Sequence, residues 1–240
     1  MQPNRNLLVR KLDPPQTWNP MVENYLRATG FYHVSRIGVI RGFHPMLATL
    51  VERCRPETHT FVLPIGEVTG TLEDVAHIFN LPIDGEPVSG WTDSSSDFRY
   101  SVVSHYWGSA CLAHLYRALC RASRYDTKEM NGPLNLLFVW AWERMPCLAP
   151  VPRQTLPPTE ISVARRWSHS ERTTALLSKA VETFRHDIDN MQEFEWRPYH
   201  GLIVPDELHP HLEIGTPFRP GIFYRRWSIG IGTYAPTDIF

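Results

Sequence analysis

The stretch that decides the fold runs from Glu52 to Gly90 and reads ERCRPETHTFVLPIGEVTGTLEDVAHIFNLPIDGEPVSG. Its first half contains the run Thr58 to Leu63, which is rich in β-branched and aromatic residues and has Phe61 and Leu63 two positions apart. Such a run is typical of a short strand, and Pro64 should end it. We therefore predict a strand over 58–63.

The second half of the stretch predicts a helix. Thr71 suits the N-cap because its hydroxyl can accept a hydrogen bond from a free backbone amide. Glu73 and Asp74 then place negative charge at the positive end of the helix dipole. The helix should stop before Pro82, and a turn should follow over 83–88.

The rest of the chain adds mostly helices. Capping residues and helical periodicity predict helices at about 20–29, from His44 onward, over 104–124, over 134–145, and from Ser168, which forms a capping-box pattern with Glu171, to about 190. Alternation at period two predicts a second strand over 193–198. We therefore predict a single α+β domain, predominantly helical, with a few short strands. Its expected core contains Leu50, Leu115, Leu119, Phe138, Trp140 and Trp142.

The composition limits the possible partners. The 240 residues carry a net charge of −1, so binding to nucleic acid or to an anionic membrane would have to be local. No run of 18 apolar residues is present, so we expect no membrane span, and residues 1–19 lack the apolar core of a secretory signal. The four cysteines lack zinc-site spacing, which favours free and mostly buried thiols in a reducing cytosolic or nuclear compartment.

Four words of the opening stretch are specific enough to point to a family. They are RPETHTF at 55–61, LPIGE at 63–67, TLEDV at 71–75 and LPIDG at 81–85, with further similar words at 31–37, 106–110 and 140–144. In these words the chain resembles the plant mobile domain family, the module of the MAINTENANCE OF MERISTEMS-like proteins and of related transposon-encoded proteins. The resemblance implies a biological setting, whereas the residues themselves indicate no chemistry.

We divide the chain into four parts: an irregular N-terminal arm over 1–18, a plant-mobile-domain-like core over 19–146, a Pro-rich linker over 147–160, and the C-terminal part of the same domain over 161–240, which diverges from the family over 222–240. The resemblance implies a long helical insert between the counterparts of Val88 and Tyr106, relative to which this chain is shortened near 91–104. A missing insert predicts exposed apolar surface on 107–119.

The candidate reactive residues do not form a site in the sequence. His209, His211 and Glu213 lack the spacing of a complete tetrahedral metal site. The family has carried the label aminotransferase-like, but pyridoxal phosphate needs a desolvated lysine near a phosphate-binding loop. Lys11, Lys128 and Lys179 have no such loop. We predict no catalytic, cofactor-binding or metal-binding residue, no cofactor, no small-molecule substrate and no enzymatic activity.

Two further sets of residues have structural explanations. Glu57 together with the adjacent Glu73 and Asp74 could supply a carboxylate pair, but acidic residues in the first turn of a helix, as Glu73 and Asp74 are, are explained by its dipole. His59 and His77 are interpreted as turn or core histidines whose ring nitrogens bond nearby backbone groups.

Arginine is the remaining candidate, because 21 of the 24 basic residues are arginines. Its planar side chain suits contacts with carboxylates, phosphates and aromatic rings. The local basic spots are Arg53 with Arg55, Arg117 with Arg121 and Arg124, Arg165 with Arg166, and Arg225 with Arg226 beside Trp227. Such spots are more often solvated faces or partners for acidic residues than nucleic-acid sites.

The resemblance implies a nuclear protein, with the cytoplasm as the alternative. We expect a non-enzymatic protein-interaction module that acts in transposon silencing, gene expression control and meristem maintenance, with a phosphatase-like protein among its partners. The alternative is a transposon-derived remnant that binds nucleic acid through its basic spots. Binding that weakens steeply with salt would favour the alternative.

Overall fold

The computed structural model describes residues 19–83, 107–124, 130–152, 162–171 and 173–202. They all belong to the first of the two units into which the chain divides, Met1–Pro210 and His211–Phe240. Their helices are α1 Pro20–Ala28, α2 Tyr32–Ser35, α3 His44–Glu52, α4 Leu72–Phe79, α6 Trp107–Ala122, α7 Leu134–Arg144, α8 Ala164–Trp167, α9 Thr174–Leu177 and α10 Val181–Asp189, together with a 3-10 turn at Pro146–Leu148. The strands are β1 Cys54–Arg55, β2 Thr60–Leu63 and β3 Gly66–Val68.

The three strands form one small antiparallel sheet in the order β1-β2-β3. Phe61 of β2 lies opposite Cys54 on one side and Val68 on the other. The strand predicted over 58–63 is therefore confirmed as the central strand. Its neighbours were not predicted because two or three residues are too few to show an alternating pattern. A two-residue turn joins β2 to β3. Gly66, the first residue of β3, has a φ of 123°, a conformation that glycine adopts more easily than other residues.

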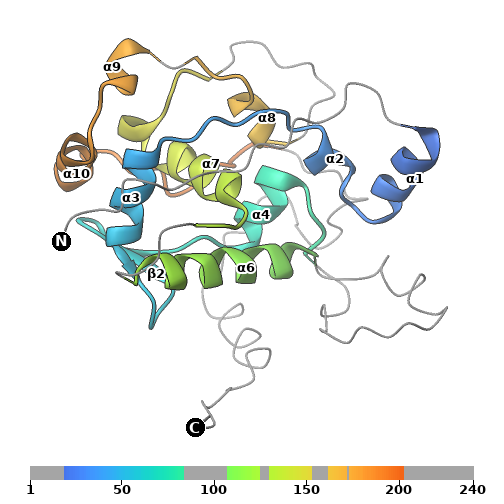
Figure 1. Ribbon diagram of the computed structural model, residues 1–240, viewed down its shortest axis with the longest axis horizontal. Helices are drawn as coiled ribbons and strands as arrows, with labels where there is room; N and C mark the ends of the chain where they lie inside the picture. Colours follow the sequence, from blue (N-terminus) through green and yellow to red (C-terminus); the bar gives the residue numbers. More distant parts are fainter. Residues whose placement is uncertain (1–18, 84–106, 125–129, 153–161, 172, 203–240) are drawn as a thin grey trace, which may run out of the picture. The chain divides into compact units, whose positions relative to one another are not determined.

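Helix α7 lies in the middle of the described fold, with α3, α4, α6 and α8 around it (Figure 1). All of its residues except Asn135 are buried. The Trp140 ring packs against Phe61 of the sheet at 5.2 Å between ring centroids, and Trp142 stacks on Phe138 at 5.8 Å. The six predicted core residues are all buried, so the sequence identified the centre of the fold correctly. The prediction of a mostly helical α+β fold is confirmed.

Helix α6 corrects the expectation of exposed apolar surface. Leu112, Leu115 and Leu119 are buried, because α4 packs against this side of α6. Trp107 is half-buried and meets the Phe31 ring edge-on at 5.1 Å. The described part of the fold therefore covers the apolar face of α6. The shortened region itself, near 91–104, lies outside the described residues.

The C-terminal part differs from the predicted elements in two ways. The helix predicted from Ser168 is broken into α9 and α10, and Thr173 is the N-cap of α9. Ser168 instead ends α8, and Glu171 pairs through its backbone with Val151, so the capping-box match was accidental. The strand predicted over 193–198 is wrong, because this segment has irregular backbone conformation and pairs with none of the described strands.

The start of the proline-rich segment packs on the domain. Leu148 is fully buried, and Val151 is exposed but bridges Glu171 through the backbone.

Among the described helices, none combines the length and the apolar character that crossing a membrane requires.

Candidate functional site

The first part of the site is the N-terminus of α4, where Thr71 and Asp74 form a reciprocal capping box. The Thr71 hydroxyl accepts a hydrogen bond from the Asp74 amide, and Asp74 Oδ2 accepts one from the Thr71 amide at 2.7 Å. This arrangement satisfies backbone donors that have no partner inside the helix. Because the Asp74 side chain turns back over the helix start, its other oxygen is directed elsewhere.

That second oxygen, Asp74 Oδ1, joins two distant parts of the chain. It accepts hydrogen bonds from Arg144 Nη2 at the end of α7 (2.6 Å) and from the Tyr199 hydroxyl (2.7 Å). The Asp74 side chain is 1% exposed and that of Arg144 11% exposed. A buried carboxylate must be paired and hydrogen-bonded, and this one is. We call Asp74, Arg144 and Tyr199 the buried triad.

The buried triad anchors the segment 191–202. Arg144 Nη1 donates to the backbone oxygens of Glu195 (3.3 Å) and Trp196 (3.4 Å), and the Glu195 amide donates to the Arg144 carbonyl at 2.9 Å. The Tyr199 ring stacks on His77 of α4 at 4.6 Å between centroids. A segment without regular secondary structure is therefore held in place by contacts with α4 and α7.

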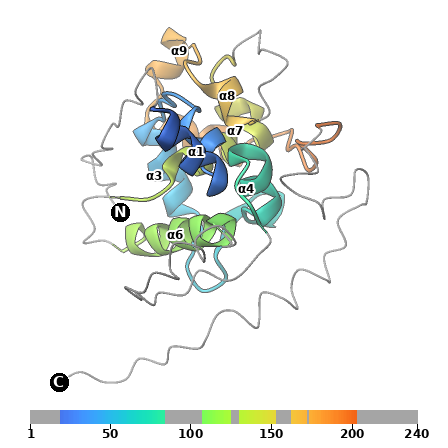
Figure 2. The ribbon, with the colours of Figure 1, turned by 90° about the vertical axis from the view of Figure 1, so that its right-hand side faces the viewer.

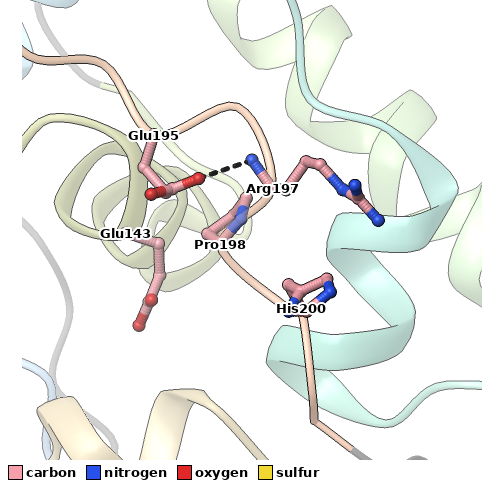
Figure 3. Close-up of a pocket in the computed structure, with 5 residues that line it drawn as sticks. All are labelled: Glu143, Glu195, Arg197, Pro198 and His200. Atoms are coloured by element: carbon pink, nitrogen blue, oxygen red, sulfur yellow. Dashed lines mark hydrogen bonds between the residues drawn. The ribbon is translucent and has the colours of Figure 1, made fainter. Parts of the chain in front are cut away.

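A shallow pocket of about 510 Å³ is lined by Glu143, Glu195, Arg197, Pro198 and His200 (Figure 3). Glu195 Oε1 accepts a hydrogen bond from the Arg197 amide at 2.8 Å. The Arg197 side chain points away from Glu143 in Figure 3. The pocket is thus open and charged, and four of its five lining residues belong to the anchored segment.

The Glu143 carboxylate is occupied by the protein itself. One oxygen accepts a hydrogen bond from the Trp167 ring nitrogen, and the other forms an ion pair with Arg166. Its side chain is 3% exposed, so the pair fixes α8 against α7 rather than facing a ligand. A carboxylate used in this way is a poor candidate for a catalytic acid or base.

Burial raises the pKa of one member of the triad, Tyr199, and of a neighbouring carboxyl, Glu73. It raises the pKa of the Tyr199 hydroxyl well above its usual range, and the Asp74 carboxylate raises that pKa further. Burial and the neighbouring Asp74 also raise the pKa of the Glu73 carboxyl, against the opposing effect of Arg144. Both shifts favour the neutral form, which suits Tyr199 as a hydrogen-bond donor to Asp74.

The other candidate residues are dispersed in the structure. Lys179 donates to Asp187 and to the Cys147 carbonyl, so it takes part in a structural ion pair. His59 occupies a positive-φ position in a turn, and its ring meets Tyr116 edge-on at 5.2 Å. No group of three potential metal ligands occurs within the described ranges. The other two lysines, Lys11 and Lys128, and the cluster His209, His211 and Glu213 lie outside them.

The cysteines are more exposed than the sequence suggested. All four are free thiols, Cys147 is exposed, and the other three are half-buried. Burial raises the pKa of the Cys54 thiol to about 11 and that of Cys111 to about 12. These two thiols are therefore weak nucleophiles at neutral pH.

The basic spots divide into two kinds. Arg53 pairs with Asp189, Arg55 with Glu67 and Arg166 with Glu143, while Arg165 donates to the Arg36 carbonyl. Arg117, Arg121 and Arg124 are exposed, on α6 and just beyond its end. Arg225, Arg226 and Trp227 are outside the described residues.

Sequence reasoning missed the buried triad. The pattern around Asp74 indicated a helix start, and the dipole alone explained the acidic residue there. Neither Arg144 nor Tyr199 has a neighbour that marks it as a partner of Asp74. A single signal was available: Arg144 is a charged residue ending a helix that is otherwise apolar on nearly every side, and such a charge needs a buried partner.

The fold and the site together define a mostly helical α+β domain in which the buried carboxylates Asp74 and Glu143 are each paired with an arginine. A model of the plant mobile domain matches residues 30–103 and 100–216. The chain belongs to the plant mobile domain family. No solved structure matches.

Curated relatives come from Arabidopsis thaliana. The chain is 31% identical over 222 residues to a serine/threonine-protein phosphatase 7 long form homolog, covering 60% of this chain and 17% of that protein. It is 22% identical over 276 residues to Protein MAIN-LIKE 1, covering 80% of this chain and 53% of the relative. It is 41% identical over 68 residues to Protein MAINTENANCE OF MERISTEMS, covering 28% and 14%. The chain thus spans no more than about half of these relatives' own length.

Proposed function

We propose that the chain is a non-enzymatic protein-interaction module of the plant nucleus that contributes to transposon silencing, control of gene expression and meristem maintenance. Family membership supports the setting, and one relative is named for the maintenance of meristems. The phosphatase name of another relative belongs to a protein of which the alignment covers 17%, so it does not make this chain an enzyme.

The observation that carries the proposal is the way the buried triad is used. Asp74, Arg144 and Tyr199 direct their hydrogen bonds to one another and to the backbone of the segment 191–202. A catalytic site needs ionisable groups that converge on a space where a substrate fits. Here the ionisable groups converge on the chain's own backbone, so their effect is to hold a loop in place.

The loop that they hold presents an aromatic side chain to solvent. Trp196 is 62% exposed although its backbone carbonyl is fixed by Arg144. The Phe194 ring supports it edge-on at 4.7 Å. An exposed tryptophan on an anchored segment loses little conformational entropy on binding, and tryptophan is enriched among the residues that dominate protein interfaces. We place the protein-binding surface at Phe194 and Trp196, with a phosphatase-like protein as the partner.

A binding measurement with one variant tests this proposal. The full chain is titrated with a purified plant serine/threonine phosphatase, and Trp196→Ala should weaken the interaction by about 10-fold or more. Tyr25→Ala is the matched control, because Tyr25 is a similarly exposed aromatic residue on α1. Equal affinity of wild type and Trp196→Ala would overturn the assigned surface. Turnover of a phosphate ester by the chain alone would overturn the non-enzymatic assignment.

The nuclear setting is tested separately. A fusion of the chain to a protein too large for passive entry should accumulate in the nuclei of plant cells. Retention of the fusion in the cytoplasm would contradict the nuclear part of the proposal and leave the binding result unaffected.

A further inference from the structure

Negative charge flanks the exposed Trp196 side chain. Glu193 and Glu195 are both exposed, and neither carboxylate forms an ion pair with another described residue. Many other acidic side chains of the described fold are paired with a cation, as Glu52 is with Arg185. The segment 191–202 therefore exposes an indole ring between two carboxylates whose charge no described residue pairs.

The Glu195 carboxylate is fixed across the base of Trp196. Its Oε1 accepts a hydrogen bond from the Arg197 amide at 2.8 Å, so the side chain folds back along the backbone of the residue between them. Its Oε2 forms no hydrogen bond with another described residue. Arg144 in turn holds the backbone oxygens of Glu195 and Trp196. A carboxylate oxygen and an indole ring thus extend from one short turn whose backbone is already ordered.

The Trp196 and Phe194 rings form an aromatic corner. Their centroids are 4.7 Å apart and their planes are inclined at 64°, while Trp196 stays 62% exposed. The face of an aromatic ring carries negative charge, and among aromatic side chains tryptophan attracts a cation most strongly. The ring faces and the carboxylates therefore favour the same kind of group, a positively charged one.

We propose that the protein partner places an arginine side chain on this surface, with its guanidinium plane on the Trp196 ring and its N–H groups directed at the Glu195 carboxylate. This inference rests on the proposed protein-binding role of Phe194 and Trp196. Arginine suits both contacts, because its guanidinium group is planar, stacks on aromatic rings and donates several hydrogen bonds along its edge. It is also more weakly hydrated than the ammonium group of lysine, so it leaves water at a lower cost.

The neighbouring Arg197 does not neutralise this surface. Its side chain points away from Glu143 in Figure 3, and it forms no ion pair with Glu195 although its amide bonds that side chain. Burial raises the pKa of the Glu73 carboxyl on α4, and the positive charge of Arg197 opposes that rise. The charge of Arg197 thus acts on α4, and the negative charge of Glu195 is available to a partner.

The experiment extends the titration of the full chain with the purified phosphatase. Glu195→Gln removes the charge but keeps an oxygen for the Arg197 amide, and it should weaken binding about three- to fivefold. Trp196→Leu keeps an apolar side chain without a ring and should weaken binding about 10-fold, and Trp196→Phe should weaken it less. Both groups contact one guanidinium, so the double variant Glu195→Gln with Trp196→Leu should lose less than the product of the two single losses.

Two controls accompany these variants. Glu182→Gln removes the same charge from α10, where the side chain is 75% exposed, and it should keep the wild-type affinity within about twofold. N-acetyl-arginine amide should compete with the phosphatase better than the corresponding lysine and leucine amides do. Unchanged thermal melts show that the variants are folded.

The outcomes separate this inference from the proposed surface. If Trp196→Ala weakens binding while Glu195→Gln and Trp196→Leu bind like wild type, the surface stands and the arginine is overturned, because Trp196 would then fill an apolar pocket. Competition by the lysine or leucine amide that equals that of the arginine amide would also overturn the arginine. Equal affinity of wild type and Trp196→Ala would overturn the surface and the arginine together.

Discussion

Helices α7 and α1 differ sharply in how much of each is buried. Helix α7 buries every residue except Asn135, whereas α1 buries none. Yet α1 has the stronger local signals: the Asn19 side chain caps it, Pro20 opens it, and Glu23 pairs with Arg27 one turn later. The residue at the N-cap of α7 is Pro133, which forms no side-chain cap.

The comparison shows two ways of stabilising a short helix. A helix of nine to eleven residues is marginal in water by itself, so it needs either capping and side-chain pairs or burial against other elements. Helix α1 relies on the first and lies at one edge of the described fold, facing the viewer in Figure 2. Helix α7 relies on the second. Three substitutions should separate these two sources of stability.

Trp142→Ala should have the largest effect. The Trp142 side chain is 2% exposed and contacts Phe138, Phe43 and Trp167, so its removal leaves a cavity in the core. We expect a loss of about 3–5 kcal/mol in the free energy of unfolding, measured by urea titration. The control Tyr25→Ala on α1 should change it by less than about 0.5 kcal/mol. Similar losses in both variants would mean that burial does not distinguish the two helices.

Tyr199→Phe should have an intermediate effect with a characteristic pH dependence. It removes a buried hydrogen bond to the Asp74 carboxylate, which contributes about 1.5–3 kcal/mol. The pKa of Tyr199 is raised in the folded protein, so above about pH 10 the unfolded chain loses this proton first. The wild type should therefore lose stability as the pH rises above about 10, and the gap to Tyr199→Phe should narrow there. A constant gap over that range would contradict the role given to the hydroxyl.

Asn19→Ala should have the smallest effect, confined to α1. The Asn19 side chain accepts a hydrogen bond from the Met21 amide at 2.9 Å, and losing such a cap costs about 1 kcal/mol of helix stability. Hydrogen exchange should become several-fold faster at the amides of α1 and stay unchanged in α7. The urea midpoint of the whole protein should stay near that of the wild type, because α1 contributes no buried residue to the core. Faster exchange in α7 would show that the two helices are coupled.

The sequence predicted helix ends better than it predicted contacts. Thr71 and Asn19 act on amides two or three residues away, so their capping roles can be identified in the chain itself. The capping box predicted at Ser168 and Glu171 is wrong because a distant contact overrides the local pattern. Its residue types fit, but the backbone of Glu171 pairs with Val151, which prevents a helix there. The segment 193–198 alternates like a strand, but Arg144 takes the place of a neighbouring strand as its hydrogen-bond partner.

The sequence by itself determined the family, the positions of α3, α4, α6 and α7, and the identity of the core. Each of these depends on short sequence motifs, capping residues or hydrophobic periodicity within a few neighbouring residues. Only the tertiary structure decided which charges are paired. Asp74 bonds with residues 70 and 125 positions away, and no local pattern encodes such distances. Only the fold showed that Arg53, Arg55, Arg165 and Arg166 are engaged within the protein and that Arg117 and Arg124 are exposed. A charge is paired or left exposed according to which elements pack beside it, and packing is a property of the whole fold.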